Sequence, residues 1–139
     1  MLKTYEGGCH CGRVRFRIQV DLEKSTVGEC NCSICTKKGI LHIGVTREQF
    51  EILCGAEDLT TYQFNTGTAK HFFCSRCGIY THHQRRSNPN EYGVNAACIE
   101  GVSPFDFAEV PVMDGVHHPS DGAPERLAGV LRFVPTPEP

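Results

Sequence analysis

Residues 72–78 read FFCSRCG, and residues 8–12 read GCHCG. A Cys-x-x-Cys-Gly turn is typical of a zinc knuckle, in which two sulfurs come from one tight turn and the glycine lets backbone amides point at them. Each cluster supplies half of a tetrahedral site and therefore needs a partner. Cys9 and Cys11 with Cys74 and Cys77 would close a four-sulfur site that joins the start of the chain to its middle. Such a site is structural, because no position remains for a substrate.

The cluster at residues 30–35, CNCSIC, differs because it offers three sulfurs at once. The sequence leaves open whether histidine, Cys54, Cys98, water or a substrate thiol completes the site. Zinc with three thiolates carries net negative charge, so it polarises water less than a three-histidine site and suits a soft thiolate ligand. Lys37 and Lys38 follow the cluster and could offset the charge, with an ordinary exposed turn as the alternative.

The nine cysteines do not suggest a disulfide framework. Their number is odd, Cys-x-Cys pairs rarely reach disulfide geometry, and the first residues lack the apolar core of a secretory signal. We therefore expect a reducing, cytoplasmic location, where clustered thiolates bind metal. The cysteines are Cys9, Cys11, Cys30, Cys32, Cys35, Cys54, Cys74, Cys77 and Cys98.

Hydrophobic periodicity indicates many short strands. Residues 13–20 alternate, with Val14, Phe16, Ile18 and Val20 on the inner side. Helical signals are short, at residues 32–38 and 46–49, and irregular structure is expected after Pro104. This pattern predicts a mainly β fold, an antiparallel sandwich or open barrel. Further strand-like runs cover residues 40–45, 50–54, 59–64, 71–74, 79–84, 92–99 and 130–134.

Length and composition indicate one domain, expected over residues 1–134, with residues 135–139 as a flexible tail. The formal net charge of −2 and the absence of interleaved basic and aromatic residues disfavour nucleic acid as a partner. No apolar run approaches the roughly 18 residues that span a bilayer, so no membrane partner is expected.

Three clusters in this order resemble the glutathione-dependent formaldehyde-activating enzyme family, whose domain also occurs in a centromere-associated protein. The matching stretches are residues 8–14, 30–35 and 72–78, with a further likeness at residues 94–99. The resemblance implies an Mss4-like β fold and two zinc ions per chain. It implies a structural zinc on Cys9, Cys11, Cys74 and Cys77, and an exchangeable, catalytic zinc on Cys30, Cys32 and Cys35.

The family's reaction adds glutathione to formaldehyde, giving S-hydroxymethylglutathione, and is classed as that of a carbon–sulfur lyase. By resemblance, the expected partners are a small thiol such as glutathione and a small aldehyde such as formaldehyde. Two departures stand out. Asn31 replaces a histidine that is frequent in the family, and the region after Glu100 shows no recognisable glutathione-binding pattern.

The alternative function is a non-catalytic zinc module that binds another protein. It requires a fourth protein ligand at the middle cluster and an exposed apolar patch. A nucleic-acid role ranks third, because the chain is acidic. The true substrate and the formation of a homodimer are left open.

An enzyme of this kind would need a proton donor for the alkoxide, and histidine is the usual one. The candidates are His42, His71, His82 and His83, with structural packing as the alternative for each. Neighbours on a strand point to opposite faces, so at most one of His82 and His83 can face the site.

Five further residues have less specific interpretations. Cys54 and Cys98 are expected to be buried apolar residues, as free cysteines commonly are. His117, His118 and Asp121 lie in a Gly- and Pro-rich loop. A third metal site there is disfavoured.

Overall fold

The computed structural model describes residues 1–25 and 27–138. Its strands are β1 Lys3–Gly8, β2 Arg15–Val20, β3 Val27–Cys30, β4 His42–Thr46, β5 Phe50–Cys54, β6 Leu59–Tyr62, β7 Lys70–Cys74, β8 Tyr80–Gln84, β9 Glu91–Asn95, β10 Glu109–Met113 and β11 Leu127–Arg132. The helix α1 spans Ser33–Lys38, and short 3-10 turns cover Arg47–Gln49, Ala56–Asp58, Ala96–Cys98, Pro104–Asp106 and Pro119–Asp121.

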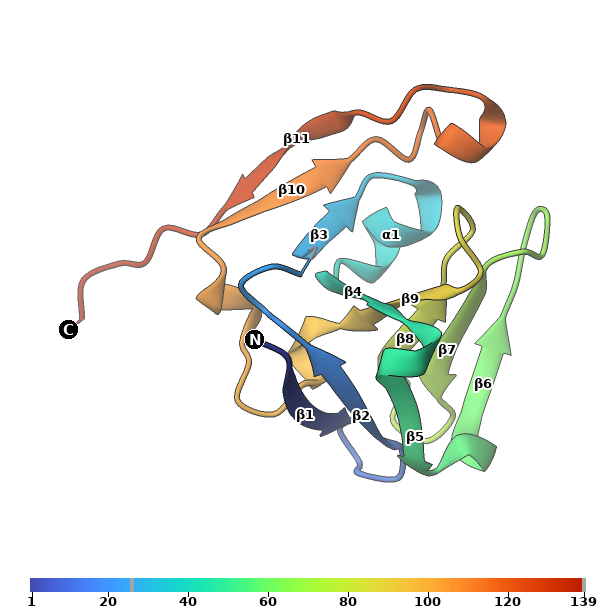
Figure 1. Cartoon of the computed structure of the whole chain (residues 1–139), viewed down its shortest axis with the longest axis vertical. Helices are drawn as coiled ribbons and strands as arrows, with labels where there is room; N and C mark the ends of the chain where they lie inside the picture. The colour runs from blue at the N-terminus through green and yellow to red at the C-terminus, as the bar shows by residue number, and fades with distance from the viewer. Residues whose placement is uncertain (26, 139) are drawn as a thin grey trace.

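The strands form two sheets (Figure 1). The smaller has the order β1-β2-β5, and the larger has the order β11-β10-β3-β4-β9-β8-β7-β6. Neither sheet closes on itself, and the helices are few and short, which confirms the mainly β prediction. The described pairs are antiparallel except β3 with β10, which run parallel through Glu29–Val112 and Cys30–Met113. This parallel pair corrects the expectation of a wholly antiparallel fold.

The core lies between the two sheets. Phe16 and Ile18 of β2 are fully buried and pack with Ile43 and Val94 from β4 and β9. Each such side chain stabilises the fold by about 1.5–3 kcal/mol through burial. The alternation expected over residues 13–20 is confirmed.

One close approach fixes how the sheets meet. Gly7 of β1 forms an isolated bridge with Ile99, which follows the turn after β9. A Cβ atom on Gly7 would lie 2.3 Å from the Cys98 carbonyl oxygen. Only glycine therefore allows the backbones to come this close. The contact holds the start of the chain, and with it the first cysteine turn, against the larger sheet.

The expectation of irregular structure after Pro104 is wrong. β10 and β11 form a hairpin whose first strand joins the larger sheet beside β3, and the second lies at residues 127–132 rather than 130–134. Pro111 obscured β10 because proline normally demotes a strand. In the fold it precedes the β10 residues that pair with β3.

Residues 133–138 have no regular secondary structure and are exposed, while Pro139, the last residue of the expected tail, lies outside the described residues. The domain boundary at residue 134 stays a prediction. Within the described part of the chain, no helix has the length and apolarity that crossing a membrane requires.

Candidate metal centres and thiol pocket

The predicted four-cysteine site is assembled from two hairpin turns. Cys9 and Cys11 lie between β1 and β2, and Cys74 and Cys77 lie between β7 and β8. All four sulfurs lie within 4.8 Å of one another, with 3.6 Å from Cys9 to Cys11 and 3.7 Å from Cys11 to Cys74. A tetrahedron with Zn–S bonds of about 2.3 Å needs sulfurs about 3.8 Å apart. The donor set and its spacing fit zinc.

Backbone amides support negative charge at this cluster. The Val14 amide donates to the Cys9 sulfur at 3.3 Å, and the Arg76 amide donates to the Cys74 sulfur at 3.4 Å. Burial alone would raise the pKa of Cys77, but backbone hydrogen bonds and the neighbouring thiols outweigh it and lower the pKa to about 6. Hydrogen bonds to the charged form stabilise the thiolate, the form that binds metal.

The second group lies where β3 runs into α1. The sulfurs of Cys30, Cys32 and Cys35 lie within 4.8 Å of one another. In the described part of the chain, no fourth histidine, cysteine or carboxylate joins all three within this distance; His42 and Glu29 group only with Cys35. Hydrogen bonds from Cys30 and Cys35 lower the pKa of Cys32 to about 2, whereas hydrogen bonds with Cys30 and Cys32 raise the pKa of Cys35. These residues offer three donors and leave a fourth direction free.

A cation lies beside this group. Lys38, at the end of α1, donates to the Tyr80 hydroxyl at 3.0 Å, and its ammonium lies 4.2 Å from the centre of that ring. Burial lowers the pKa of Lys38, while negative charge on Cys35 and Cys32 opposes this shift. Lys37 is exposed, as a surface turn predicts, but Lys38 faces the cysteines.

A cavity of about 880 Å³ opens over the three cysteines. His42, His71 and His83 line it, and His82 on the next position of β8 lines a different cavity, which confirms that only one of the tandem histidines can face the site. Three buried ring nitrogens, His42 Nε2, His71 Nε2 and His83 Nδ1, have no hydrogen-bond partner among the described residues. Buried polar atoms normally have partners, so these three are available to water or a ligand.

Burial favours the neutral form of His42, His71 and His83. Burial lowers the pKa of His42 to about 3 and that of His71 to about 4, and it lowers the pKa of His83 well below its ordinary value. Desolvation disfavours the charged ring, and the Lys38 ammonium adds to the effect. This disfavours the expected role of a pocket imidazolium as proton donor.

The far wall of the pocket is formed by residues 114–126, of which the sequence analysis named His117, His118 and Asp121, and only as a disfavoured metal site. The Asn31 side-chain oxygen accepts from the amides of Gly115 at 2.8 Å and Val116 at 3.2 Å. A Cβ atom on Gly115 would lie 2.3 Å from the Cys30 sulfur. The buried Asp114 carboxylate accepts from Arg126 Nε at 2.6 Å and contacts His117 Nδ1 at 3.0 Å. The Arg126 hydrogen bond above all lowers the pKa of Asp114.

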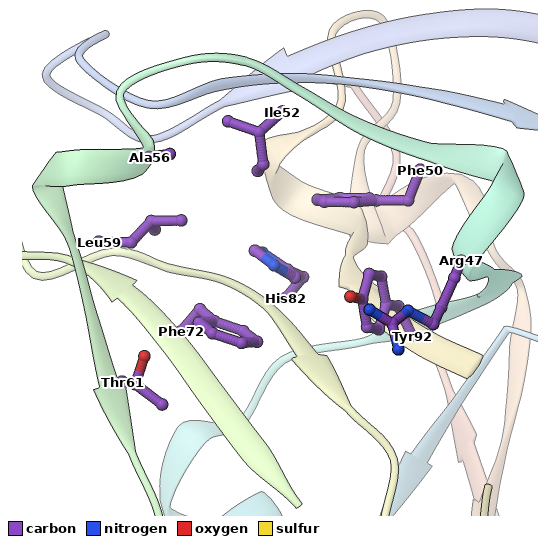
Figure 2. Close-up of a pocket in the computed structure, with 9 residues that line it drawn as sticks. All are labelled: Arg47, Phe50, Ile52, Ala56, Leu59, Thr61, Phe72, His82 and Tyr92. Atoms are coloured by element: carbon purple, nitrogen blue, oxygen red, sulfur yellow. The ribbon is translucent and has the colours of Figure 1, made fainter. Parts of the chain in front are cut away.

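A second cavity, of about 490 Å³, contains no cysteine (Figure 2). His82 lies between Phe50 and Phe72, with ring centres 4.4 and 4.5 Å away, and Arg47 and Tyr92 lie to one side. His82 Nδ1 is 2.9 Å from the Thr81 hydroxyl, and burial lowers the pKa of His82 to about 3. This ring is a neutral part of the aromatic packing.

The His82→Gln variant is expected to lose part of the acid sensitivity of the fold. Below about pH 6.5 the histidine of the unfolded chain binds a proton, whereas the buried ring of the folded protein stays neutral. The contribution of His82 to the free energy of unfolding therefore falls by about 1 kcal/mol between pH 6.5 and 5.5 in the parent protein. Urea unfolding of both proteins across this range gives the two slopes. Metal loss in acid affects both alike, so equal slopes would contradict the assignment.

Other expected residues are placed as follows. Cys54 is exposed, so the expectation of burial is wrong, because β5 lies at an edge of the small sheet. Cys98 is half-buried and contacts the Tyr80 carbonyl at 3.6 Å. His118 and Asp121 belong to no metal-binding group of the described chain, and Asp121 pairs instead with Arg86 at 2.5 Å. None of the nine cysteines forms a disulfide.

The fold and the two thiol groups define a β protein built around cysteine-rich turns. The family model described as glutathione-dependent formaldehyde-activating enzyme matches residues 4–110. The chain therefore belongs to this family. The match ends inside β10, so the wall formed by residues 114–126 lies outside it.

One named relative agrees with the family assignment, and one solved structure shares the fold. A Halomonas elongata protein named "Putative glutathione-dependent formaldehyde-activating enzyme" is 38% identical in an alignment of 80 residues that covers 52% of this chain and 50% of the relative. The chain thus spans about half the length of this curated relative. A crystal structure of a Rhodobacter sphaeroides protein is similar with a TM-score of 0.74 and 50% identity, over 77% of this chain and 98% of the other.

Proposed function

We propose that the protein is a zinc-dependent carbon–sulfur lyase that adds a small thiol, such as glutathione, to a small aldehyde, such as formaldehyde. Cys9, Cys11, Cys74 and Cys77 would hold a structural zinc, and Cys30, Cys32 and Cys35 would hold the zinc of the active site. The family name supports the reaction class. The proposal includes a reducing compartment, because thiols must stay reduced to bind metal.

The observation that carries the proposal is the difference between the two cysteine groups. One has four sulfurs within bonding reach of a common centre, whereas the other has three and faces a large cavity. A closed tetrahedral site has no position for substrate, while a site with three protein ligands keeps one. Zinc bound by the three thiolates would supply a soft Lewis acid that favours a deprotonated substrate thiol.

The chain's own groups suit the charge that such a reaction develops. The Lys38 ammonium beside Cys35 offsets the negative charge of clustered thiolates. In the addition, the thiol loses its proton and its sulfur forms a bond to the aldehyde carbon as the carbonyl π bond breaks. The aldehyde oxygen then takes up one proton, so the reaction has no net change in protons. The neutral ring nitrogens of the pocket can hydrogen-bond the aldehyde oxygen or ordered water without contributing charge.

Zinc stoichiometry and zinc-edge X-ray absorption, with and without excess glutathione, test this function. We expect two zinc ions per chain, one of which changes its coordination when glutathione is added, and S-hydroxymethylglutathione as the product with formaldehyde. Two zinc ions whose coordination does not change when glutathione is added would refute the proposal.

A second candidate, a protein-binding zinc module, is favoured by one observation. β11 is exposed along its whole length, and Leu127, Val130 and Leu131 each expose more than half of their surface. Exposed apolar surface of this kind marks contact sites. The other requirement of this candidate, a fourth protein ligand at the middle cluster, is not met among the described residues. Unresponsive zinc in all-protein shells would make this the better function.

A further inference from the structure

We propose that the pocket over Cys30, Cys32 and Cys35 selects thiols without net negative charge, and that the wall formed by residues 114–126 imposes this selection. The inference rests on the proposed function and narrows its thiol substrate. It concerns a part of the chain that lies outside the family match.

Hydrogen bonds hold the wall against the three-cysteine group. Asn31 lies between two of the cysteines, and its side-chain oxygen accepts hydrogen bonds from two backbone amides of the wall. Its own backbone amide donates a hydrogen bond to the Met113 carbonyl at 3.2 Å. Gly115 leaves no room for a Cβ atom beside the Cys30 sulfur. A substrate thiol that reaches the cysteines enters the cavity that these wall residues help to line, so residues 114–126 border its path.

Acidic groups outnumber basic ones around this path. Five carboxylates and three guanidinium groups line the cavity, a formal charge of −2 before the cysteines are counted. The wall contributes three of these carboxylates, those of Asp114, Asp121 and Glu125, but only one of the guanidinium groups. With a divalent metal bound, the three thiolates would add one negative charge, which the Lys38 ammonium beside Cys35 offsets, so the surroundings of the path keep their negative charge.

Every arginine that lines the cavity is already engaged by a carboxylate. Arg126 pairs with Asp114 at 2.6 Å, and Arg85 pairs with Glu91 at 3.1 Å. Arg86 is held through both of its terminal nitrogens by Asp121, at 2.5 and 3.2 Å. Because Asp121 already binds both nitrogens, a substrate carboxylate cannot form the same bidentate pair with Arg86.

Two cavity carboxylates lie outside the ion pairs of the described residues, although the Lys38 ammonium attracts that of Glu29 from a longer distance. Neither Glu29 nor Glu125 forms an ion pair with another described residue. Glutathione brings two carboxylates and one ammonium group, so it meets like charge here and finds its guanidinium partners occupied. A thiol of the same shape without those negative charges meets no such repulsion.

Binding of glutathione and of its dimethyl ester to the cobalt-substituted protein tests this selection. The ester keeps the thiol and the peptide framework but removes both negative charges, and cobalt reports a new thiolate ligand through its visible spectrum. We expect the ester to bind about tenfold more tightly than glutathione, and the difference to shrink at high salt, which screens charge.

The Asp121→Asn variant identifies the wall as the cause. It removes one negative charge and frees Arg86, so the preference for the ester should fall at least about threefold. Glu57→Gln, which changes an exposed carboxylate outside the cavity by the same charge, should leave the preference unchanged. Equal affinity for the two thiols, or equal effects of the two variants, would overturn the inference alone. A cobalt spectrum that ignores both thiols would overturn the proposed function as well.

Discussion

Replacing Cys74 with serine is expected to unfold the protein at ambient temperature. Cys74 is fully buried, packs with Cys9 and Val14, and supplies one of the four sulfurs that join two distant turns. Structural zinc contributes on the order of 10 kcal/mol to folding, and a domain of this size is stable by about 5–15 kcal/mol in total. Loss of this ligand therefore removes most of the margin.

Zinc content and thermal unfolding followed by circular dichroism measure this effect. Cys54→Ser is the matched control, because Cys54 is exposed and makes only a weak contact with the Arg13 carbonyl at 3.7 Å. That change should cost less than about 1 kcal/mol. A Cys74→Ser protein that melts close to the parent temperature would contradict a structural metal at this position.

The Cys32→Ser variant should have the opposite profile, with a preserved fold and a lost activity. Cys32 lies half-exposed at the start of α1, at the border of the cavity and away from the main core. We expect one zinc per chain instead of two and a fall in kcat/KM of more than about 100-fold, because even the loss of a group that only hydrogen-bonds to a metal ligand costs about 10–100-fold.

Its control is Ser33→Ala, an exposed change one residue further along the same helix. Zinc analysis, melting temperature and product formation from formaldehyde are compared for the three proteins. Retention of both metals and of product formation by Cys32→Ser would exclude the three-cysteine group as the reactive centre.

Local patterns in the sequence were enough for much of the fold. The alternation at residues 13–20 and the short apolar runs that became β4, β5, β7, β8 and β9 depend on side chains that face one core, so their period is visible in the chain. β1 and β3 were missed because glycines and charged residues dilute their pattern, and their pairing comes from neighbours in the sheet.

The cysteine groups were predictable because spacing within a turn restricts which sulfurs can converge. The pocket wall was not, because its contacts join residues far apart in the chain, such as Asn31 with Gly115, 84 positions away. Neither residue belongs to a sequence pattern that predicts this contact. The orientation of Lys38 likewise depends on Tyr80, which reaches it from another strand.

The two turns that supply the four-sulfur site also affect how the chain reaches its fold. Cys11 and Cys74 are 63 positions apart, so the complete site exists only after a long loop has closed. The entropy of that closure must be paid before the last two ligands can bind. Zinc present during early folding meets isolated cysteine pairs, including those of the 30–35 segment, and can bridge the wrong ones. Refolding is therefore a competition between collapse of the β sandwich and premature metal capture, and zinc supplied after collapse should give the higher yield of native protein.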